Sequence, residues 1–180
     1  MIKDLLSELY RNGSKGWLMA SEEKFALEAC IVEAGPGDYL EIGVNRGGSL
    51  AFAGLIKRHL KQAGTVYGIE IGLAWKPEID KFVQGLSLTP TVFYKNSHPW
   101  PAGDLKPVVA FIDGDHYGDA PINDWNNLKD RVQRFILFHD CDEGSDVEGA
   151  VENAKHDGAW RFVTMSGCMA VFERAHLPGG

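Results

Sequence analysis

Two nearly continuous apolar runs, each closed by an acidic residue, restrict the fold of this chain more than any other feature of its sequence. The first run spans residues 107–113 and ends at Asp113, and the second spans residues 134–140 and ends at His139 and Asp140. Strands that are covered on both faces have this composition, and they are typical of parallel sheets. The two runs therefore predict central strands of an α/β protein.

Shorter apolar runs alternate with helix-spaced segments along the rest of the chain. Further strands are predicted at residues 39–44, 65–71, 91–94, 160–164 and 168–172. Apolar residues recur at the helical period in 52–60 and 122–132 and, more loosely, in 21–32, where Ser21 with two following glutamates indicates a helix start. The gap between the last two strands is too short for a crossover helix, so we expect an antiparallel hairpin.

Charge and composition exclude several classes of partner. The chain has 18 Lys and Arg against 25 Asp and Glu, which gives a formal net charge of −7. Without a basic excess, we expect neither a nucleic-acid partner nor binding to an anionic membrane. We interpret the one basic run, residues 57–61, as the solvated face of a helix. No apolar run approaches the roughly 20 residues of a membrane-spanning helix.

The N-terminus and the cysteines indicate the compartment. Acidic residues stand near the start of the chain, where a signal peptide would carry an apolar stretch. The three cysteines, Cys30, Cys141 and Cys168, form no CxxC pair and suggest no disulfide framework. These features predict a cytoplasmic protein.

Ligands of open parallel sheets bind beyond the carboxyl ends of the strands, and the first such end is a glycine-rich turn, residues 41–49. Glycines there let the backbone approach a ligand closely. Glu41 would repel a pyrophosphate but suits a ligand with an ammonium group, such as the methionine part of S-adenosylmethionine. Glu70, which ends the next strand, can accept hydrogen bonds from both hydroxyls of an adenosine ribose.

A second group of polar residues ends the two long apolar runs. If a right-handed crossover joins these strands, they can lie side by side, about 4.8 Å apart, and their terminal carboxylates converge. Two carboxylates that close need a cation or a shared proton. A divalent ion such as Mg²⁺ suits Asp113 and Asp140, whereas His139 is a better ligand for Mn²⁺, Fe²⁺ or Zn²⁺. The alternative is that Asp115 caps a helix and the histidines are hydrogen-bonded in the core.

Four motifs resemble those of class I S-adenosylmethionine-dependent methyltransferases, in particular the small branch of macrocin-type sugar O-methyltransferases and cephalosporin-hydroxylase-like proteins. They are residues 39–49 (YLEIGVNRGGS), 66–70 (VYGIE), 111–116 (FIDGDH) and 138–140 (FHD), and residues 16–18 (GWL) also resemble that branch. The resemblance runs from about Gly16 to Phe172. It implies a Rossmann-like, doubly wound sheet of about seven strands, mostly parallel with an antiparallel C-terminal strand.

The resemblance also implies a set of site residues in a single domain, 1–180, with an N-terminal helical segment, 1–37, and a Rossmann-like core, 38–174. We assign cofactor contacts to Glu41, Gly43, Gly47, Ser49, Glu70 and Asp115, metal-ligand positions to Asp113, His139 and Asp140, and catalysis to His116 and Asp113. His116 matches the general base of the sugar methyltransferases, a role that suits an imidazole at neutral pH. His139 stands where several metal-dependent relatives carry an acid.

The sequence therefore predicts an S-adenosylmethionine-dependent enzyme that methylates a hydroxyl of a small molecule or sugar, assisted by a divalent metal. Two alternatives stay open. Asp113-Gly114-Asp115 is also a D-x-D sequence that could hold a metal-bound nucleotide sugar in a glycosyltransferase-like enzyme, and the fold could bind its cofactor without catalysis. The chain leaves little room for a separate lid, so the acceptor could be contacted by the first 20 residues, by residues 97–104 or by a second copy in a homo-oligomer.

Overall fold

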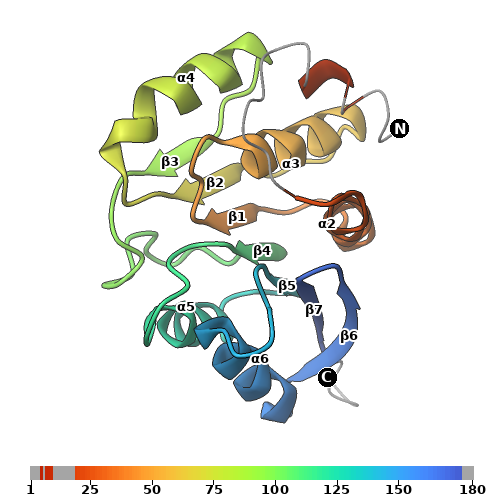
Figure 1. The fold of residues 1–180 in the computed structure, drawn as a ribbon. Coiled ribbons are helices and arrows are strands. Elements are labelled where there is room, and N and C mark those ends of the chain that lie inside the picture. The colour runs from red at the N-terminus through yellow and green to blue at the C-terminus, as the bar shows by residue number, and fades with distance from the viewer. Residues whose placement is uncertain (1–4, 6, 10–18, 176–180) are drawn as a thin grey trace.

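The computed structural model describes residues 5, 7–9 and 19–175. Within these residues, seven strands form one sheet in the order β3-β2-β1-β4-β5-β7-β6 (Figure 1). The strands are β1 (Tyr39–Ile42), β2 (Val66–Ile69), β3 (Thr91–Phe93), β4 (Val109–Ile112), β5 (Phe135–Phe138), β6 (Trp160–Ser166) and β7 (Met169–Arg174). The helices are α2 (Ser21–Ala34), α3 (Gly48–His59), the short 3₁₀ helix η1 (Leu73–Trp75), α4 (Lys76–Gly85), α5 (Ala120–Leu128) and α6 (Asp146–His156).

The pairing of the strands confirms the predicted sheet. β1, β2, β3, β4 and β5 pair in parallel, and β4 lies beside β5 as the two long apolar runs predicted. β6 and β7 form the predicted antiparallel hairpin, and β7 runs antiparallel to β5. The fold is therefore the Rossmann-like, doubly wound α/β fold with a reversed C-terminal strand.

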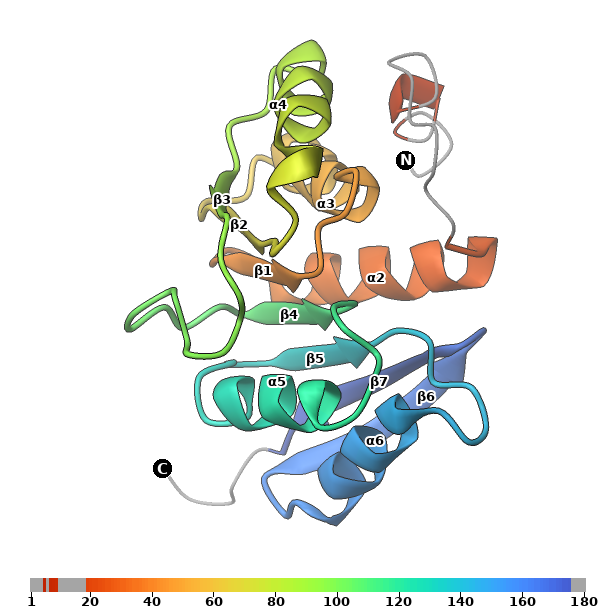
Figure 2. The ribbon, with the colours of Figure 1, turned by 60° about the vertical axis from the view of Figure 1, so that its left-hand side comes forward.

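Alternate side chains of the central strands enter two cores on opposite faces of the sheet. Phe111 of β4 packs with residues of α2, α3 and α4, whereas Ile112, the next residue, packs with residues of α5 and α6. Figure 2 shows α5 and α6 on the opposite side of the sheet from α2 and α3. Coverage on both faces explains why the two long runs are apolar at nearly every position.

The connection from β3 to β4, residues 94–108, is described in full and contains neither helix nor strand. Trp100 and Leu105 of this segment pack, partly buried, against the core under α5 and α6. The connection thus stands in place of a crossover helix on that face of the sheet.

One interpretation of the sequence is wrong at a single residue, since Arg58, His59 and Lys61 of the basic run are exposed but Lys57 is not. Lys57, in the basic run that we assigned to a solvated helix face, is buried at 4% exposure. Its Nζ donates hydrogen bonds to the carbonyl oxygens of Gly37, at 2.7 Å, and Ala63, at 3.1 Å. The long apolar stem lets the ammonium group reach the loops at the end of α3, so the position tolerates burial. In the part of the chain that the structure describes, no helix has the length and apolar character needed to cross a membrane.

Candidate active site

A cavity of about 670 Å³ opens where β1, β2, β4 and β5 end. Ile42, Ile112 and Phe138 are paired across β1, β4 and β5, so the residues that follow them meet at one edge of the sheet. The described residues that line the cavity include eight of the predicted site residues: Gly43, Ser49, Glu70, Asp113, Asp115, His116, His139 and Asp140. The predicted metal residues and four of the six predicted cofactor residues therefore share one cavity.

The turn between β1 and α3 brings backbone close to the end of β4. Gly43 has φ +86°, and a Cβ at this position would lie 1.9 Å from the carbonyl oxygen of Asp113. Gly47, directly before α3, has φ +84°, and its amide donates to the carbonyl of Val44 at 2.8 Å. Both glycines thus adopt a conformation that other residues rarely take.

Glu41 does not present its carboxyl group to the cavity. The side chain is fully buried, and Glu41 and Gly47 are not among the described residues that line the cavity. The Glu41 carboxyl accepts hydrogen bonds from the Ser49 hydroxyl at 2.7 Å and the Tyr39 hydroxyl at 2.9 Å. Burial raises the pKa of Glu41 to about 8. The geometry therefore makes Glu41 a residue that positions Ser49 and the turn, in contrast to the direct contact with an ammonium group that we expected.

Glu41→Gln is expected to flatten the pH dependence of stability. Glu41 has a pKa of about 8 in the folded protein against a usual 4.5, so between these values the folded state binds more protons than the unfolded state. The free energy of unfolding should therefore fall as pH rises from 4.5 to 8, by roughly 1.4 kcal/mol for each unit of pKa shift as an upper bound. Urea unfolding at pH 5, 6.5 and 8 measures this, and equal slopes in the variant and the wild type would contradict it.

Glu70 holds the glycine turn and also faces the cavity. Its carboxylate accepts hydrogen bonds from the amide of Asn45 at 2.7 Å and from the amide of Gly72 at 2.6 Å. The residue is 6% exposed and lines the cavity. Because each carboxylate oxygen has two lone pairs, both oxygens can accept a further hydrogen bond from a ligand.

Asp113, His116 and Asp140 form an ionic cluster at the ends of β4 and β5. Nδ1 of His116 lies 3.0 Å from Oδ2 of Asp140, and its Nε2 lies 3.6 Å from Oδ1 of Asp113. The nearby Asp113 carboxylate is the main cause that raises the pKa of His116. Burial alone would raise the pKa of Asp113, but His116 and His139 together lower it.

His139 is 10% exposed at its side chain and faces acidic groups on both sides of its ring. Nδ1 lies 3.1 Å from Oδ1 of Asp140 and 3.3 Å from Oδ1 of Asp113, and Nε2 lies 3.3 Å from Oε2 of Glu23. Burial lowers the pKa of His139, but the surrounding carboxylates outweigh burial and raise the pKa to about 9. A network this acidic is suited to a cation.

The predicted metal ligands fit a divalent ion. Asp113, His139 and Asp140 each offer a ligand atom, and these atoms all lie within 4.8 Å of one another. Nδ1 of His139 and Nε2 of His116 are buried and have no partner in hydrogen-bond geometry among the described residues. Both of these nitrogens face Oδ1 of Asp113, at 3.3 Å and 3.6 Å.

Two acidic residues and one thiol of the cavity wall were not predicted from the sequence as site residues: Glu23, Asp124 and Cys168. Glu23 was interpreted as part of a helix start, and α2 does begin there, with the amide of Ala20 donating to Oε2 of Glu23 at 2.6 Å. Asp124 is 3% exposed, and burial raises its pKa to about 6. In the sequence, the only indication that Asp124 has a special role is that this acidic residue stands among the apolar residues of the predicted helix 122–132.

The segments proposed to contact the acceptor contribute little to the described cavity wall. Ser97 lines the cavity, but His98 and the rest of 97–104 are not among its described lining residues. Of the first 20 residues, Met19 and Ala20 line it. The GWL motif at residues 16–18 lies outside the described residues.

Comparison of the sequence with protein-family models and with curated proteins finds no match. Solved structures share the fold over most of the chain, and many of them are described as methyltransferases. The Rossmann-like fold with a reversed last strand is therefore the methyltransferase fold.

Three of these structures illustrate the likeness. A Klebsiella pneumoniae protein assigned as an O-methyltransferase is 13% identical, covers 97% of this chain and 90% of its own, and has a TM-score of 0.74. The O-methyltransferase from Bacillus cereus, solved in complex with SAH, is 13% identical over 97% of this chain and 90% of its own, with a TM-score of 0.70. The O-methyltransferase NovP is 19% identical over 86% of this chain and 80% of its own, with a TM-score of 0.66.

Proposed function

We propose that this chain is an S-adenosylmethionine-dependent O-methyltransferase that acts on a small hydroxylated molecule or sugar with the help of a divalent cation. The observation that carries the proposal is one shared cavity, in which Glu70 and the Gly43 turn lie on one side and the Asp113–His116–Asp140 cluster on the other. A cofactor held by the first group would meet an acceptor held by the second. O-methyltransferases among the structural relatives support the reaction type.

The residues of the first two strand ends fit the cofactor. Gly43 keeps the turn free of side-chain atoms where a Cβ would collide with β4, Ser49 lies at the start of α3, and Glu70 has acceptor capacity for ribose hydroxyls. Asp115, in the wall beside them, completes the proposed cofactor set. When bound, the cofactor supplies an electrophilic methyl group on a sulfonium.

The second group of residues is assigned to the acceptor. Asp113 and Asp140, with His139 as a third ligand, would hold the cation, which when bound orients the acceptor hydroxyl and lowers its pKa. His116 lies between the two carboxylates and accepts the hydroxyl proton as the new bond forms. Asp113 contacts both histidines and so couples the base to the cation site.

The glycosyltransferase-like alternative predicts that the cavity binds a nucleotide sugar in place of S-adenosylmethionine. It requires Asp113 and Asp115 to face one metal-bound diphosphate. Oδ1 of Asp115 instead accepts a hydrogen bond from the amide of Tyr117 at 3.1 Å, whereas Asp113 contacts His116 and His139. The two carboxylates thus have separate partners, which favours the methyltransferase.

Calorimetry with S-adenosylhomocysteine and with a UDP-sugar tests the proposal. The wild-type protein is expected to bind S-adenosylhomocysteine, and Glu70→Ala should weaken binding by roughly 10- to 150-fold, as for lost hydrogen bonds to a charged group worth about 1.5–3 kcal/mol. Glu78→Ala is a matched control, because Glu78 is an exposed acid of α4 that does not line the described cavity. It should leave affinity unchanged.

Glu70→Ala also leaves the amides of Asn45 and Gly72 without their carboxylate. Thermal unfolding of each variant therefore accompanies the calorimetry. Binding of the UDP-sugar in place of S-adenosylhomocysteine would overturn the proposal. So would unchanged affinity in a folded Glu70→Ala variant.

A further inference from the structure

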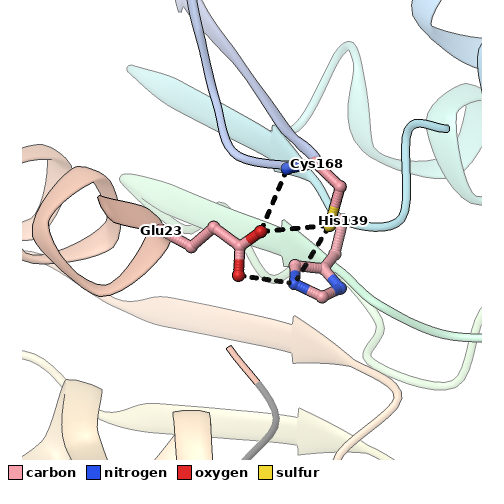
Figure 3. Close-up of side chains that lie close together, drawn as sticks. All are labelled: Glu23, His139 and Cys168. Atoms are coloured by element: carbon pink, nitrogen blue, oxygen red, sulfur yellow. Dashed lines mark hydrogen bonds and ion pairs between the residues drawn. The ribbon is translucent and has the colours of Figure 1, made fainter. Parts of the chain in front are cut away.

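Three potential metal ligands meet beside the proposed acceptor site, and two of them, Glu23 and Cys168, have no role in the proposed mechanism. Glu23 comes from α2, His139 follows β5, and Cys168 lies in the turn between β6 and β7 (Figure 3). Each offers a ligand atom, and these atoms all lie within 4.8 Å of one another. We propose that Glu23, His139 and Cys168 form a binding site for Zn²⁺.

The distances between the donor atoms approach those of a tetrahedral zinc site. Sγ of Cys168 lies 3.0 Å from Oε1 of Glu23 and 3.9 Å from Nε2 of His139, and Nε2 lies 3.3 Å from Oε2 of Glu23. Zinc bonds of about 2.0–2.3 Å at tetrahedral angles place neighbouring ligand atoms roughly 3.3–3.6 Å apart. The two short distances to Glu23 end on different oxygens of its carboxylate, so coordination through one oxygen requires the Glu23 side chain to rotate and Sγ to move closer to Nε2.

The backbone around Cys168 is shaped to let Glu23 approach. Gly167, the preceding residue, has φ +63°, and a Cβ there would lie 2.5 Å from Oε1 of Glu23. The amide of Cys168 also donates to this oxygen at 3.0 Å. Glu23 is 3% exposed, so α2 and the hairpin enclose its carboxylate. The cluster is therefore a built site in which three separate elements converge.

The donor set favours zinc over magnesium. A thiolate, an imidazole and a carboxylate are the three ligand types that Zn²⁺ takes in proteins, whereas Mg²⁺ requires oxygen ligands. On binding, the thiol of Cys168 releases its proton to solvent and its sulfur donates an electron pair to the ion. All three residues line the cavity, so the fourth position is open to water or a ligand, as in zinc sites with three protein ligands.

The zinc site also gives His139 a definite orientation. With Nε2 bound to zinc, Nδ1 carries the ring proton and faces Asp113 and Asp140, at 3.3 and 3.1 Å. Metal-bound histidines commonly donate their second nitrogen to a carboxylate in this way. His139 then serves as a zinc ligand instead of as the third ligand of the reaction's cation, which Asp113 and Asp140 hold without it.

Cobalt substitution tests the site in the full chain. After dialysis against a chelator, Co²⁺ is expected to bind with one equivalent per chain at this site, with a thiolate-to-cobalt absorption band, and Zn²⁺ should displace it. Cys168→Ser should abolish the band and lower zinc affinity by more than about 100-fold, because even a residue that only supports a ligand changes metal affinity 10- to 100-fold. Cys141→Ser is the matched control, since Cys141 lies beside the same turn and bonds the carbonyl of Phe138.

Metal binding by two variants distinguishes the zinc site from the cation site of the proposed methyltransferase. Asp113→Asn should keep the cobalt–thiolate band and lose Mn²⁺ binding, whereas Cys168→Ser should keep Mn²⁺ binding. Absence of a thiolate band in the wild-type protein overturns the zinc site, as does a band that Cys141→Ser removes and Cys168→Ser keeps. If Cys168→Ser does not fold, the wild-type and Cys141→Ser spectra decide the question. None of these readouts depends on methyl transfer.

Discussion

His116→Ala is expected to reduce the rate of methyl transfer by 10²–10⁴-fold, the range in which a positioned general base contributes to catalysis. When the neutral ring carries its proton on Nδ1, His116 is held by Oδ2 of Asp140 at 3.0 Å, and its Nε2 is buried without a hydrogen-bond partner among the described residues. This nitrogen is therefore available to accept a proton. The measurement is kcat, followed by release of S-adenosylhomocysteine with an acceptor found by screening hydroxylated small molecules and sugars.

The affinity for S-adenosylhomocysteine distinguishes catalysis from packing. Because His116 contacts Asp113 and Asp140, and the proposed cofactor contacts other than Asp115 follow β1 and β2, cofactor affinity in His116→Ala should stay within about threefold. His98→Ala is the control, since His98 does not line the described cavity, and its kcat should equal that of the wild type. Lost cofactor binding with normal residual turnover would favour a packing role for His116.

Gly43→Ala is expected to lower the free energy of unfolding by about 3–5 kcal/mol, a sum of backbone strain and overpacking. The new Cβ would lie 1.9 Å from the carbonyl oxygen of Asp113 and 2.6 Å from Cα of Gly114, and both are backbone atoms that cannot rotate away. The residue would also have to keep a φ of +86°. The ends of β1 and β4 must therefore separate, which displaces Asp113 from the two histidines.

Gly103→Ala separates the two causes of this effect. Gly103 has φ +55°, and no described atom lies within 4 Å of a Cβ placed there, so the substitution adds strain without collision. We expect a loss of about 1 kcal/mol, typical of a left-handed residue that gains a side chain. Urea unfolding measures both variants. If Gly43→Ala destabilises no more than Gly103→Ala does, the close approach of the turn to β4 is not essential.

The strands of the sheet could be predicted because the spacing of apolar residues along the sequence indicates which faces of each strand are buried. Nearly continuous apolar residues in 107–113 and 134–140 required strands covered on both faces, and β4 and β5 do pair in parallel between two cores. The short gap before the last strand required a hairpin. Since ligands of such sheets bind at the carboxyl ends of the strands, the location of the cavity followed as well.

The roles of single polar side chains could not be predicted in the same way. Lys57 and Glu41 both have sequence neighbours that suggest exposure to solvent or ligand, yet both are buried and bonded to protein groups. Burial of one long or charged side chain depends on whether a partner lies within hydrogen-bond reach. That distance is a property of the packed structure.

By itself, the sequence determined the class of fold, its seven strands, three of its helices and the edge of the sheet where Asp113, His116 and Asp140 meet. Only the tertiary structure decided that Glu23 joins His139, because 116 residues separate them and no pattern in the chain links the start of α2 to the end of β5. Their contact arises from the way α2 packs across β4, β5 and β6. Hydrophobic spacing specifies which face of α2 is buried, whereas the 3.3 Å between Nε2 of His139 and Oε2 of Glu23 depends on the exact placement of the helix on the sheet.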